Sequence, residues 1–358
     1  MKSNCIFVPN YSSFMKSYIN NISRSLSSYH KCKVVIYGVE TDIASSDKME
    51  INFDKDLDYL YKNNDPRIYE KFLDFVDENE FDKIFIPRLT HPEYFFSELR
   101  IRTISPEVVF SLFAFELFSK SKARRELLTD LICSSGISRV LIHSILGGHL
   151  TIPFEYRASE VVEKIKFVPE PVYESEELYG GLVSTSNLKP KILYFGNMFY
   201  GKGVDLLLAA SGLVKNEMEI VIAGDFGKKN FDFNSAEIIA NDFVQVLDGF
   251  IEQDEMIELF RNCDAVVLPY RKTYEYGTSG VFVQAMLAGK PVLVPDIYPF
   301  NYSVETYSCG LVFKAENVVD LARGLDEIVE FDKRSFKTGI IRFRDDRISW
   351  DQLTSHII

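Results

Sequence analysis

At 358 residues the chain is too long for one ordinary hydrophobic core, so we expect two domains. Its 46% hydrophobic and 26% charged residues are typical of a globular protein, and its net charge of −12 disfavours binding to nucleic acid. No apolar run approaches the roughly 20 residues that span a bilayer. The first ten residues, MKSNCIFVPN, lack the apolar segment of a signal peptide. These features predict a cytoplasmic protein.

The five cysteines are scattered, odd in number and without a Cys-x-x-Cys pair. We therefore expect a reducing compartment, no disulfide framework and no metal site. Charge is spread unevenly: residues 1–172 carry 22 Lys and Arg against 24 Asp and Glu, whereas the remainder carries 18 against 28. The nearly neutral first part can approach an anionic membrane surface, and the acidic second part would be repelled by it. The inner face of the cell membrane is therefore an alternative location.

Residues 1–172 alternate strand and helix patterns, as a parallel sheet covered by helices requires. Apolar segments predict strands at 5–9, 33–39, 83–87, 107–113, 139–143 and 166–169. Helical patterns between them predict helices at 14–27, 56–78 and 121–134. Residues 173–188, YESEELYGGLVSTSNL, interrupt the alternation with Gly-Gly and polar residues and predict a linker.

The alternation resumes at residue 189. Strands are predicted at 191–195, 219–223, 243–247, 265–269, 291–295 and 311–313, and helices at 203–214, 254–262 and 318–329, before a charged helical tail. Two successive Rossmann-like domains place a ligand cleft between them. The predicted fold class is α/β, with two Rossmann-like domains facing across a cleft.

The segment 265–296, AVVLPYRKTYEYGTSGVFVQAMLAGKPVLVPD, reads as strand, polar loop, helix and strand. A Gly-Thr-Ser-Gly turn opens the helix, whose first turn carries no acidic residue. Small residues at a helix N-terminus leave backbone N–H groups open to an anion, and ligands of open α/β sheets lie beyond the carboxyl ends of strands. This segment predicts a phosphate-bearing ligand.

Residues 189–353 resemble the retaining glycosyltransferases of the GT-B fold, family 4, through an ordered series of motifs. The motifs are ILYFGNMFYGKGVDLLLAA, IVIAGDF, VLDGFIEQDEMIELFRNCDAVVLPY, YGTSGVFVQAMLAGKPVLVPD, CGLVF and FRDDRISWDQL. The first half matches only in general pattern, through ISRVLIHS and KFVPEPV. The resemblance implies an acceptor-side domain at 1–172, a donor domain at 189–332 and a C-terminal helix at 333–358 that crosses back to the first domain.

The Gly-Lys-Gly turn holds Gly201 and Lys202, and in the family this lysine contacts the donor pyrophosphate. A point charge beside a helix N-terminus suits a diphosphate, and a solvated lysine in a turn is the alternative. Five residues earlier the family has an arginine, which is Asn197 here and carries no charge. Arg271 or Lys272, in the loop after the Leu-Pro strand, is the candidate to replace it.

The family's two glutamates, eight positions apart, correspond to Tyr276 and Gln284. Gln284 can still accept a hydrogen bond from a ribose hydroxyl. Glu275 is the candidate to face the sugar, and a surface loop acid is the alternative. Four turn residues are expected against the phosphates and sugar, where helix capping by a hydroxyl is a compatible interpretation: Gly277, Thr278, Ser279 and Gly280.

The first domain offers fewer candidates. In place of the family's glycine-bearing phosphate loop it has Asn10, Ser12 and Ser13, of which the serines can cap a helix. His91 follows the third predicted strand and joins Glu275 as a catalytic candidate, although a lone histidine is more often structural. One predicted helix starts with a run of basic residues. This run could dock on anionic lipid or a lipid diphosphate, and a solvated helix face is the alternative. The run consists of Lys120, Lys122, Arg124 and Arg125.

The resemblance implies transfer of a hexosyl-type group from a nucleotide-sugar to a hydroxyl of a glycan or lipid-linked acceptor, with retention, in building a bacterial surface polysaccharide or lipopolysaccharide. The chain shows no clustered Asp and Glu motif, so we expect no metal or other cofactor, and leaving-group charge falls to Lys202, helix termini and Arg271. The replacements at 197, 276 and 284 also fit a GT-B protein that binds a nucleotide-sugar or glycan without turnover. A nucleotide-sugar epimerase, which needs no acceptor, is the third reading.

Overall fold

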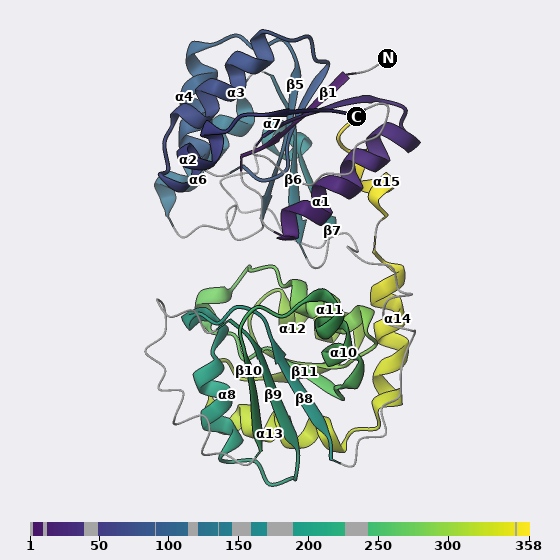
Figure 1. Cartoon of the computed structure of the whole chain (residues 1–358). Helices are drawn as coiled ribbons and strands as arrows, with labels where there is room; N and C mark the ends of the chain where they lie inside the picture. Colours follow the sequence, from purple (N-terminus) through teal and green to yellow (C-terminus); the bar gives the residue numbers. More distant parts are fainter. Residues whose placement is uncertain are drawn as a thin grey trace. The chain divides into compact units, whose positions relative to one another are not determined.

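The computed structural model describes residues 3–9, 13–38, 49–89, 91–113, 121–134, 136–144, 159–169, 189–225, 243–347 and 349–358. The chain divides into two compact units, Met1–Tyr173 with Ile348–Ile358, and Glu174–Arg347. Each unit is built around one parallel sheet with helices on both faces (Figure 1). The predictions for Asn10, Ser12, Lys120 and the linker at 173–188 fall outside the described residues.

The described strands of the first unit form a parallel sheet in the order β3-β2-β1-β4-β5-β6-β7. They are β1 (Ser3–Val8), β2 (Lys33–Gly38), β3 (Met49–Phe53), β4 (Lys83–Ile86), β5 (Glu107–Phe113), β6 (Ile137–Ser144) and β7 (Ile165–Pro169). The helices are α1 (Ser13–Arg24), its π-helical continuation η1 (Ser25–Tyr29), α2 (Asp56–Lys62), α3 (Arg67–Asp77), α4 (Pro92–Ile101), α6 (Lys122–Cys133) and α7 (Ser159–Lys164).

Three elements of this unit were not predicted: β3, α4 and α7. β3 is an edge strand with no fully buried residue, so it lacks the continuous apolar run of its neighbours. The single helix predicted at 56–78 is wrong. It is two helices, because Asn64 takes a left-handed backbone (φ 52°) and Pro66 has no N–H with which to continue a helix.

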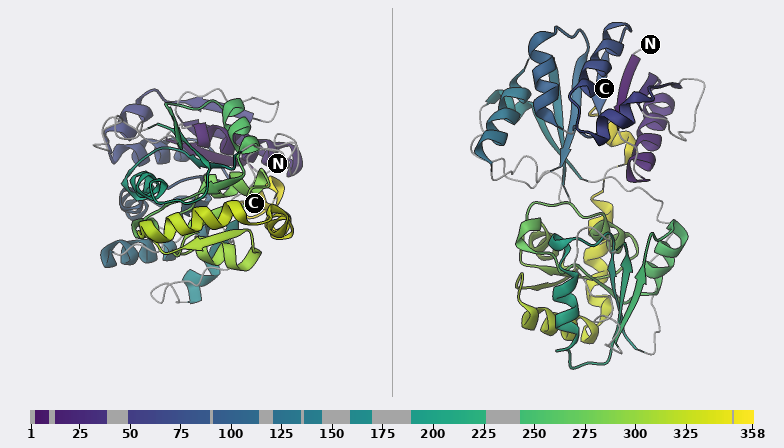
Figure 2. Two further views of the ribbon diagram at one scale, coloured as in Figure 1. Left: turned by 90° about the horizontal axis from the view of Figure 1, so that it is seen from below. Right: turned by 60° about the vertical axis from the view of Figure 1, so that its left-hand side comes forward.

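The helix α15 (Trp350–Thr354) completes the core of the first unit. Leu353 and Ile357 are fully buried among side chains of α1 and the sheet. The Trp350 ring packs edge-on against Tyr18 of α1, with 5.4 Å between ring centroids. Figure 2 shows the yellow C-terminal segment beside the purple α1. The first unit therefore needs both ends of the chain to close its core.

The expected tail at 333–358 divides between the units. The short helix η7 (Lys333–Phe336) and α14 (Lys337–Asp345) belong to the second unit, and the chain joins the first unit only at residue 348. α14 packs against α11 and α12 of the second unit, and the Tyr307 hydroxyl donates to Asp346 at 2.8 Å. The boundary therefore lies about one helix later than the charged composition of the tail indicated.

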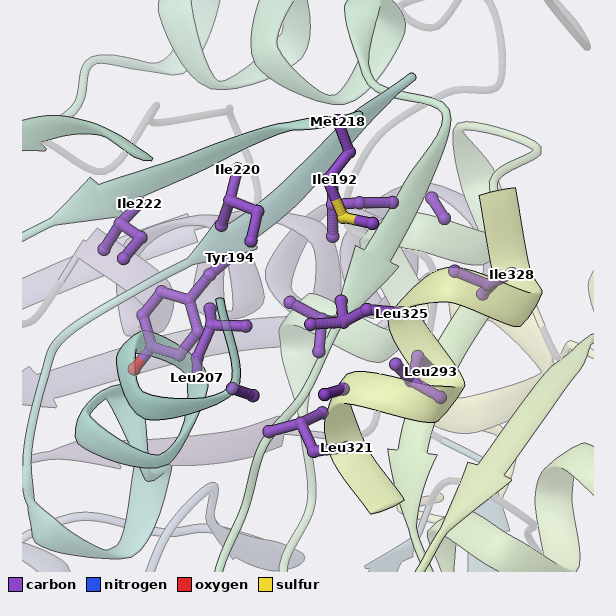
Figure 3. Packing of buried hydrophobic residues seen from close by; sticks show 14 of the residues in the cluster. Ile192, Tyr194, Leu207, Met218, Ile220, Ile222, Leu293, Leu321, Leu325 and Ile328 are labelled. Carbon is purple, nitrogen blue, oxygen red and sulfur yellow. The ribbon is translucent and has the colours of Figure 1, made fainter. Parts of the chain in front are cut away.

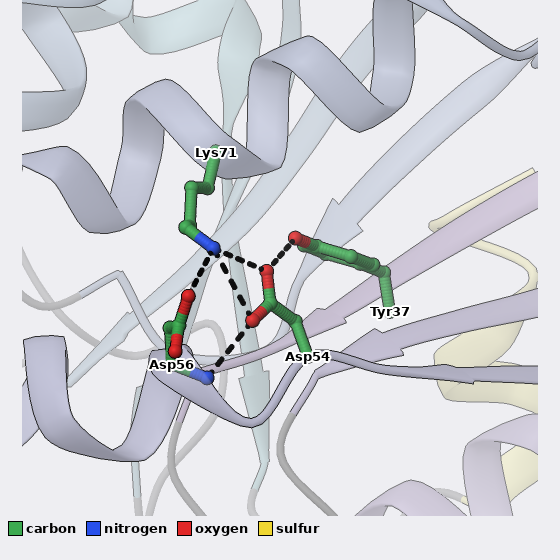
Figure 4. Close-up of polar contacts among 4 residues, drawn as sticks. All are labelled: Tyr37, Asp54, Asp56 and Lys71. Carbon is green, nitrogen blue, oxygen red and sulfur yellow. Dashed lines mark hydrogen bonds and ion pairs between the residues drawn. The ribbon is translucent and has the colours of Figure 1, made fainter.

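Asp54 fastens the loop after β3 to β2 and α3 (Figure 4). Its carboxylate accepts hydrogen bonds from the Asp56 N–H at 2.9 Å, from Lys71 Nζ at 3.0 Å and from the Tyr37 hydroxyl at 2.8 Å. Burial raises the pKa of Asp54, but these hydrogen bonds outweigh burial, and the net pKa lies below the ordinary value.

We expect Asp54→Asn to lower the free energy of unfolding of the first unit by about 1–3 kcal/mol at pH 7, because the network loses its charged acceptor. Since the folded pKa is lowered, this contribution is fully present above the unfolded pKa and fades as the pH falls through the folded pKa. Urea unfolding at pH 7 and at pH 3 measures both effects. Asp56→Asn is the matched control, because its side chain is 57% exposed and an exposed pair contributes about 0–1 kcal/mol. Equal losses in the two variants would contradict the assignment.

The described strands of the second unit form a parallel sheet in the order β10-β9-β8-β11-β12-β13. They are β8 (Lys191–Phe195), β9 (Glu219–Gly224), β10 (Val244–Asp248), β11 (Ala265–Val267), β12 (Val292–Pro295) and β13 (Gly310–Phe313). The remaining elements are η5 (Tyr200–Lys202), α8 (Val204–Ser211), α10 (Gln253–Asn262), η6 (Lys272–Tyr274), α11 (Gly280–Leu287), α12 (Phe300–Tyr307) and α13 (Val318–Glu330). Each strand and helix predicted here is found, whereas α12 was not predicted.

One face of this sheet packs against α8 and α13 (Figure 3). Ile192 and Tyr194, at alternate positions of β8, lie against Leu207 of α8 and Leu325 of α13. The helices α10, α11 and α12 follow β10, β11 and β12, and right-handed crossovers place them on the opposite face. Helices on both faces leave the carboxyl edge of the strands as the place where loops can gather.

Candidate functional site

The loops after β8 and β11 meet where the second sheet reverses its strand order. The Arg271 N–H donates to the Gly201 carbonyl oxygen at 2.9 Å. Gly203 has φ 64°, and a Cβ there would lie 2.0 Å from the carbonyl oxygen of Pro269, so only glycine allows the two loops this approach. Ligands of open α/β sheets bind at such a switch point, beyond the carboxyl ends of the strands. Lys202 lies between these two loops.

Lys202 is buried, with 8% of its surface exposed, so it is not a solvated lysine in a turn. Its Nζ donates to the Tyr270 hydroxyl at 2.7 Å and lies 4.2 and 4.9 Å from the ring centroids of Tyr270 and Tyr274. Burial lowers the pKa of Lys202, and Tyr274 acts in the opposite direction. No carboxylate in the described ranges forms an ion pair with Lys202. Among the described residues, the site therefore holds a buried cation without an anionic partner.

The N-terminus of α11 is joined to Lys202 through Tyr270. The Tyr270 hydroxyl lies 3.0 Å from Ser279 Oγ, which caps the helix by accepting the Phe282 N–H at 3.3 Å. The first turn of α11 has no acidic residue, and nothing lies within 4 Å of where a Cβ of Gly280 would be. This end of the helix combines the positive end of its dipole with open space.

Arg271 is engaged elsewhere. Its guanidinium pairs with Asp205 and lies 4.1 Å from the centroid of the Tyr200 ring. Its Nε donates to the Tyr200 carbonyl oxygen at 3.0 Å. Arg271 thus holds η5 in place through Tyr200, and Asp205 neutralises its charge. This geometry does not support the prediction that Arg271 replaces the missing arginine. Asn197 is exposed on the loop after β8.

The positions of the family's two glutamates lie at and just before α11. Tyr276 takes a left-handed backbone (φ 63°), and its N–H donates to the Tyr298 carbonyl oxygen at 2.8 Å. Glu275 and Gln284 are both half-buried. Their sugar-facing and ribose-facing roles stay predictions.

The two glycines of the turn before α11, Gly277 and Gly280, differ in the space around them. A Cβ at Gly277 would lie 2.6 Å from the Tyr274 ring, whose hydroxyl donates to the Thr278 carbonyl oxygen at 2.9 Å. The small size of Gly277 therefore serves internal packing, and its expected contact with a ligand stays a prediction. Gly280 alone of the pair has open space in front of it.

The candidate site residues of the first unit are not brought together at one site among the described residues. His91 directly precedes α4 with φ 52°, its Nδ1 is 3.3 Å from Glu93, and its ring stacks on Tyr94. Ser13 is the first residue of α1. These observations give His91 local partners that suit a structural role, and its catalytic role stays a prediction.

The basic run begins α6, as predicted. Lys122 is 80% exposed and pairs with Glu126 at 3.5 Å, and Ser121 caps the helix by accepting the Arg124 N–H at 3.3 Å. Arg124 and Arg125 are half-buried. At Lys122 the geometry is that of a solvated helix face.

Sequence reasoning missed two tyrosines and an aspartate that build the site: Tyr270, Tyr274 and Asp205. The interval from Tyr270 to Tyr276 was predicted to be a polar loop, but Tyr270 is 1% exposed. The available signal was an aromatic residue directly after the Leu-Pro strand end, where a solvent-facing loop favours small polar residues. Asp205 gave no signal, because its pairing with Arg271 joins positions 66 residues apart.

Among the described residues, no three His, Cys, Asp or Glu side chains are grouped as a metal ion requires. Likewise, none of the helices in those ranges has both the length and the apolar character to cross a membrane.

The fold and site define an α/β protein with two Rossmann-like sheets and a cation at the switch point of the second. Residues 184–338, less than half of the chain, match the family Glycosyl transferases group 1. A curated relative from Campylobacter jejuni, N,N'-diacetylbacillosaminyl-diphospho-undecaprenol alpha-1,3-N-acetylgalactosaminyltransferase, is 25% identical over 166 residues. That match covers 46% of this chain and 42% of the relative, less than half of its length.

Solved structures agree in fold over the whole chain. Sucrose-phosphate synthase from Thermosynechococcus elongatus aligns with a TM-score of 0.73 at 15% identity, covering 99% of this chain and 97% of that one. HepE from Anabaena, in complex with UDP and glucose, aligns with a TM-score of 0.65 at 14% identity, covering 99% and 98%. The predicted α/β fold with two Rossmann-like domains of GT-B type is confirmed.

Proposed function

We propose that this protein is a glycosyltransferase that moves a sugar from a nucleotide-sugar donor to a hydroxyl of a glycan or lipid-linked acceptor, with retention. The observation that carries the proposal is the buried Lys202 ammonium, which has no carboxylate partner among the described residues and is linked to the N-terminus of α11. A buried cation is costly unless it is paired, and a diphosphate supplies two or more negative charges. The donor diphosphate is the anion that this site lacks.

The chemistry follows from where charge develops. When the bond from the sugar to the diphosphate breaks, negative charge grows on the leaving oxygen. Lys202 and the backbone N–H groups at the start of α11 are fixed before the reaction, so they stabilise that charge without reorganising. Gln284, on α11, accepts a hydrogen bond from a ribose hydroxyl, and Glu275 contacts the sugar. The proposal needs no metal ion or other cofactor.

The acceptor class is inferred from the relatives. The Campylobacter relative is named for a diphospho-undecaprenol acceptor, and another similar structure is titled WaaG, a glycosyltransferase involved in lipopolysaccharide biosynthesis. A lipid-linked or polymeric glycan acceptor in surface-polysaccharide synthesis follows by analogy. Contact with an anionic membrane through the basic start of α6 belongs to the same proposal.

A non-catalytic nucleotide-sugar or glycan binder is the second candidate. The observation that favours it is the ion pair of Arg271 with Asp205, which leaves Lys202 as the buried basic side chain without an ion pair at this switch point in the described residues. An epimerase would likewise need no acceptor.

Release of nucleoside diphosphate separates these candidates. The purified protein is incubated with UDP-, GDP-, ADP- and dTDP-sugars, with and without a panel of glycan and lipid-diphosphate acceptors. We expect release with one nucleotide-sugar that rises at least about tenfold when an acceptor is present, because closure around the acceptor excludes water. Tight binding without release favours the non-catalytic protein, and conversion of the sugar without an acceptor favours the epimerase.

A further inference from the structure

Tyr270 follows β11, and its hydroxyl lies between the Lys202 ammonium and the N-terminus of α11. Lys202 Nζ is 2.7 Å from it on one side, and Ser279 Oγ is 3.0 Å from it on the other. We propose that Tyr270 is a positioning residue that holds the Lys202 ammonium toward the N-terminus of α11, so that both meet the same diphosphate. This inference rests on the proposed function and adds a residue to it.

The Tyr270 hydroxyl hydrogen-bonds to both neighbours. An ammonium carries donors only, so the Tyr270 oxygen accepts from Lys202, whereas in its contact with Ser279 either hydroxyl can donate. Ser279 Oγ also accepts the Phe282 N–H at 3.3 Å. One hydroxyl therefore ties a flexible four-carbon side chain to the capping residue of α11.

The ring of Tyr270 is itself held in place. It is 1% exposed, lies edge-on to Phe300 with 5.4 Å between centroids, and is 4.6 Å from the Tyr274 ring. Side chains locked by packing position a functional group more sharply than mobile ones do. The ammonium also faces the rings of Tyr270 and Tyr274, which favour its charged form.

Removing only the hydroxyl distinguishes positioning from packing. Tyr270→Phe keeps the ring, its aromatic neighbours and its face toward the ammonium. It removes one acceptor of the ammonium's hydrogen bonds, so Lys202 should titrate at lower pH than in the wild type. A hydroxyl that mattered only for packing would leave this titration unchanged.

The matched control is Tyr194→Phe. Tyr194 is also 1% exposed and lies in the same unit, on β8, but its hydroxyl has no hydrogen-bond partner among the described residues. Both variants delete one buried phenolic oxygen. Only one of them cuts the link between Lys202 and Ser279.

The experiment has two readouts on the full chain. Carbon-detected NMR of labelled lysines follows the Lys202 titration without ligand, and calorimetry gives the Kd of UDP, GDP, ADP and dTDP as a function of pH. For Tyr270→Phe we expect the Lys202 titration to move to lower pH. We also expect nucleoside diphosphate affinity to fall about tenfold, as loss of a charge-assisted hydrogen bond predicts, with its alkaline limb also at lower pH. Tyr194→Phe should match the wild type in both.

The outcomes separate the two proposals. A wild type that binds nucleotide, with a Tyr270→Phe variant of equal affinity and unchanged Lys202 titration, overturns the positioning role and leaves the proposed function standing. A wild type that binds no nucleoside diphosphate overturns both. If Tyr270→Phe does not fold, Ser279→Ala cuts the same link at its other end, and unchanged affinity and pH dependence there overturn the positioning role.

Discussion

Lys202→Met is expected to lower kcat/KM by about 10²–10³, as loss of one preorganised electrostatic group typically does. The substitution keeps an unbranched side chain as far as the ε position and removes the ammonium, which is linked through Tyr270 to the N-terminus of α11. Binding should fall with it: at about 100 times its Kd, a ligand stabilises the wild type by roughly 2.7 kcal/mol, and this stabilisation should disappear. Thermal unfolding with the panel of nucleoside diphosphates, followed by steady-state kinetics, measures both effects.

Lys215→Met is the control for that experiment. Lys215 is exposed and precedes β9, at the opposite end of the strands from the site. Lys215→Met removes one positive charge from the same acidic unit as Lys202→Met, so a general effect of net charge would appear in both variants. A Lys202→Met variant that keeps the nucleotide response and the rate of the wild type would remove Lys202 from the donor site.

Leu353→Ala is expected to lower the free energy of unfolding of the first unit by about 2–5 kcal/mol, as truncation of a fully buried leucine does. Leu353 lies on α15 in the core that α1 and the sheet form, although α15 comes at the end of the chain. Chemical unfolding, followed by probes in each unit, gives the loss. The transition of the second unit should stay in place, because its core is separate.

Ser355→Ala, two residues away, is the matched control. Ser355 is exposed and its hydroxyl donates only to the Gln352 carbonyl oxygen, at 2.6 Å, so we expect a change within about 0.5 kcal/mol. If Leu353→Ala were as mild as Ser355→Ala, α15 would be a surface attachment and not a part of the core.

The fold was predictable because its signals are local. In the second unit each strand is a short apolar run and each predicted helix has its own periodic pattern, so the order of elements followed directly. β3 was missed because it is an edge strand with polar residues between half-buried ones. The break between α2 and α3 was readable at Pro66, where apolar periodicity outweighed the turn residues in our interpretation.

The site was only partly predictable because its charges are balanced by residues far apart in the chain. Lys202 and the helix start at Gly280 followed from local patterns. The compensation of Arg271 by Asp205, and the burial of Tyr270 between Lys202 and Ser279, depend on how two loops meet. No pattern within either loop carries that information, which is why the burial of Tyr270 in a loop predicted to be polar was missed.

The most direct test of the donor site is a crystal structure of the protein with the nucleoside diphosphate that stabilises it. The account predicts phosphate oxygens within hydrogen-bonding distance, about 2.7–3.2 Å, of Lys202 Nζ and of the backbone N–H groups that open α11. A diphosphate bound elsewhere, with Lys202 Nζ still hydrogen-bonded to Tyr270 and in contact with no phosphate, would contradict it.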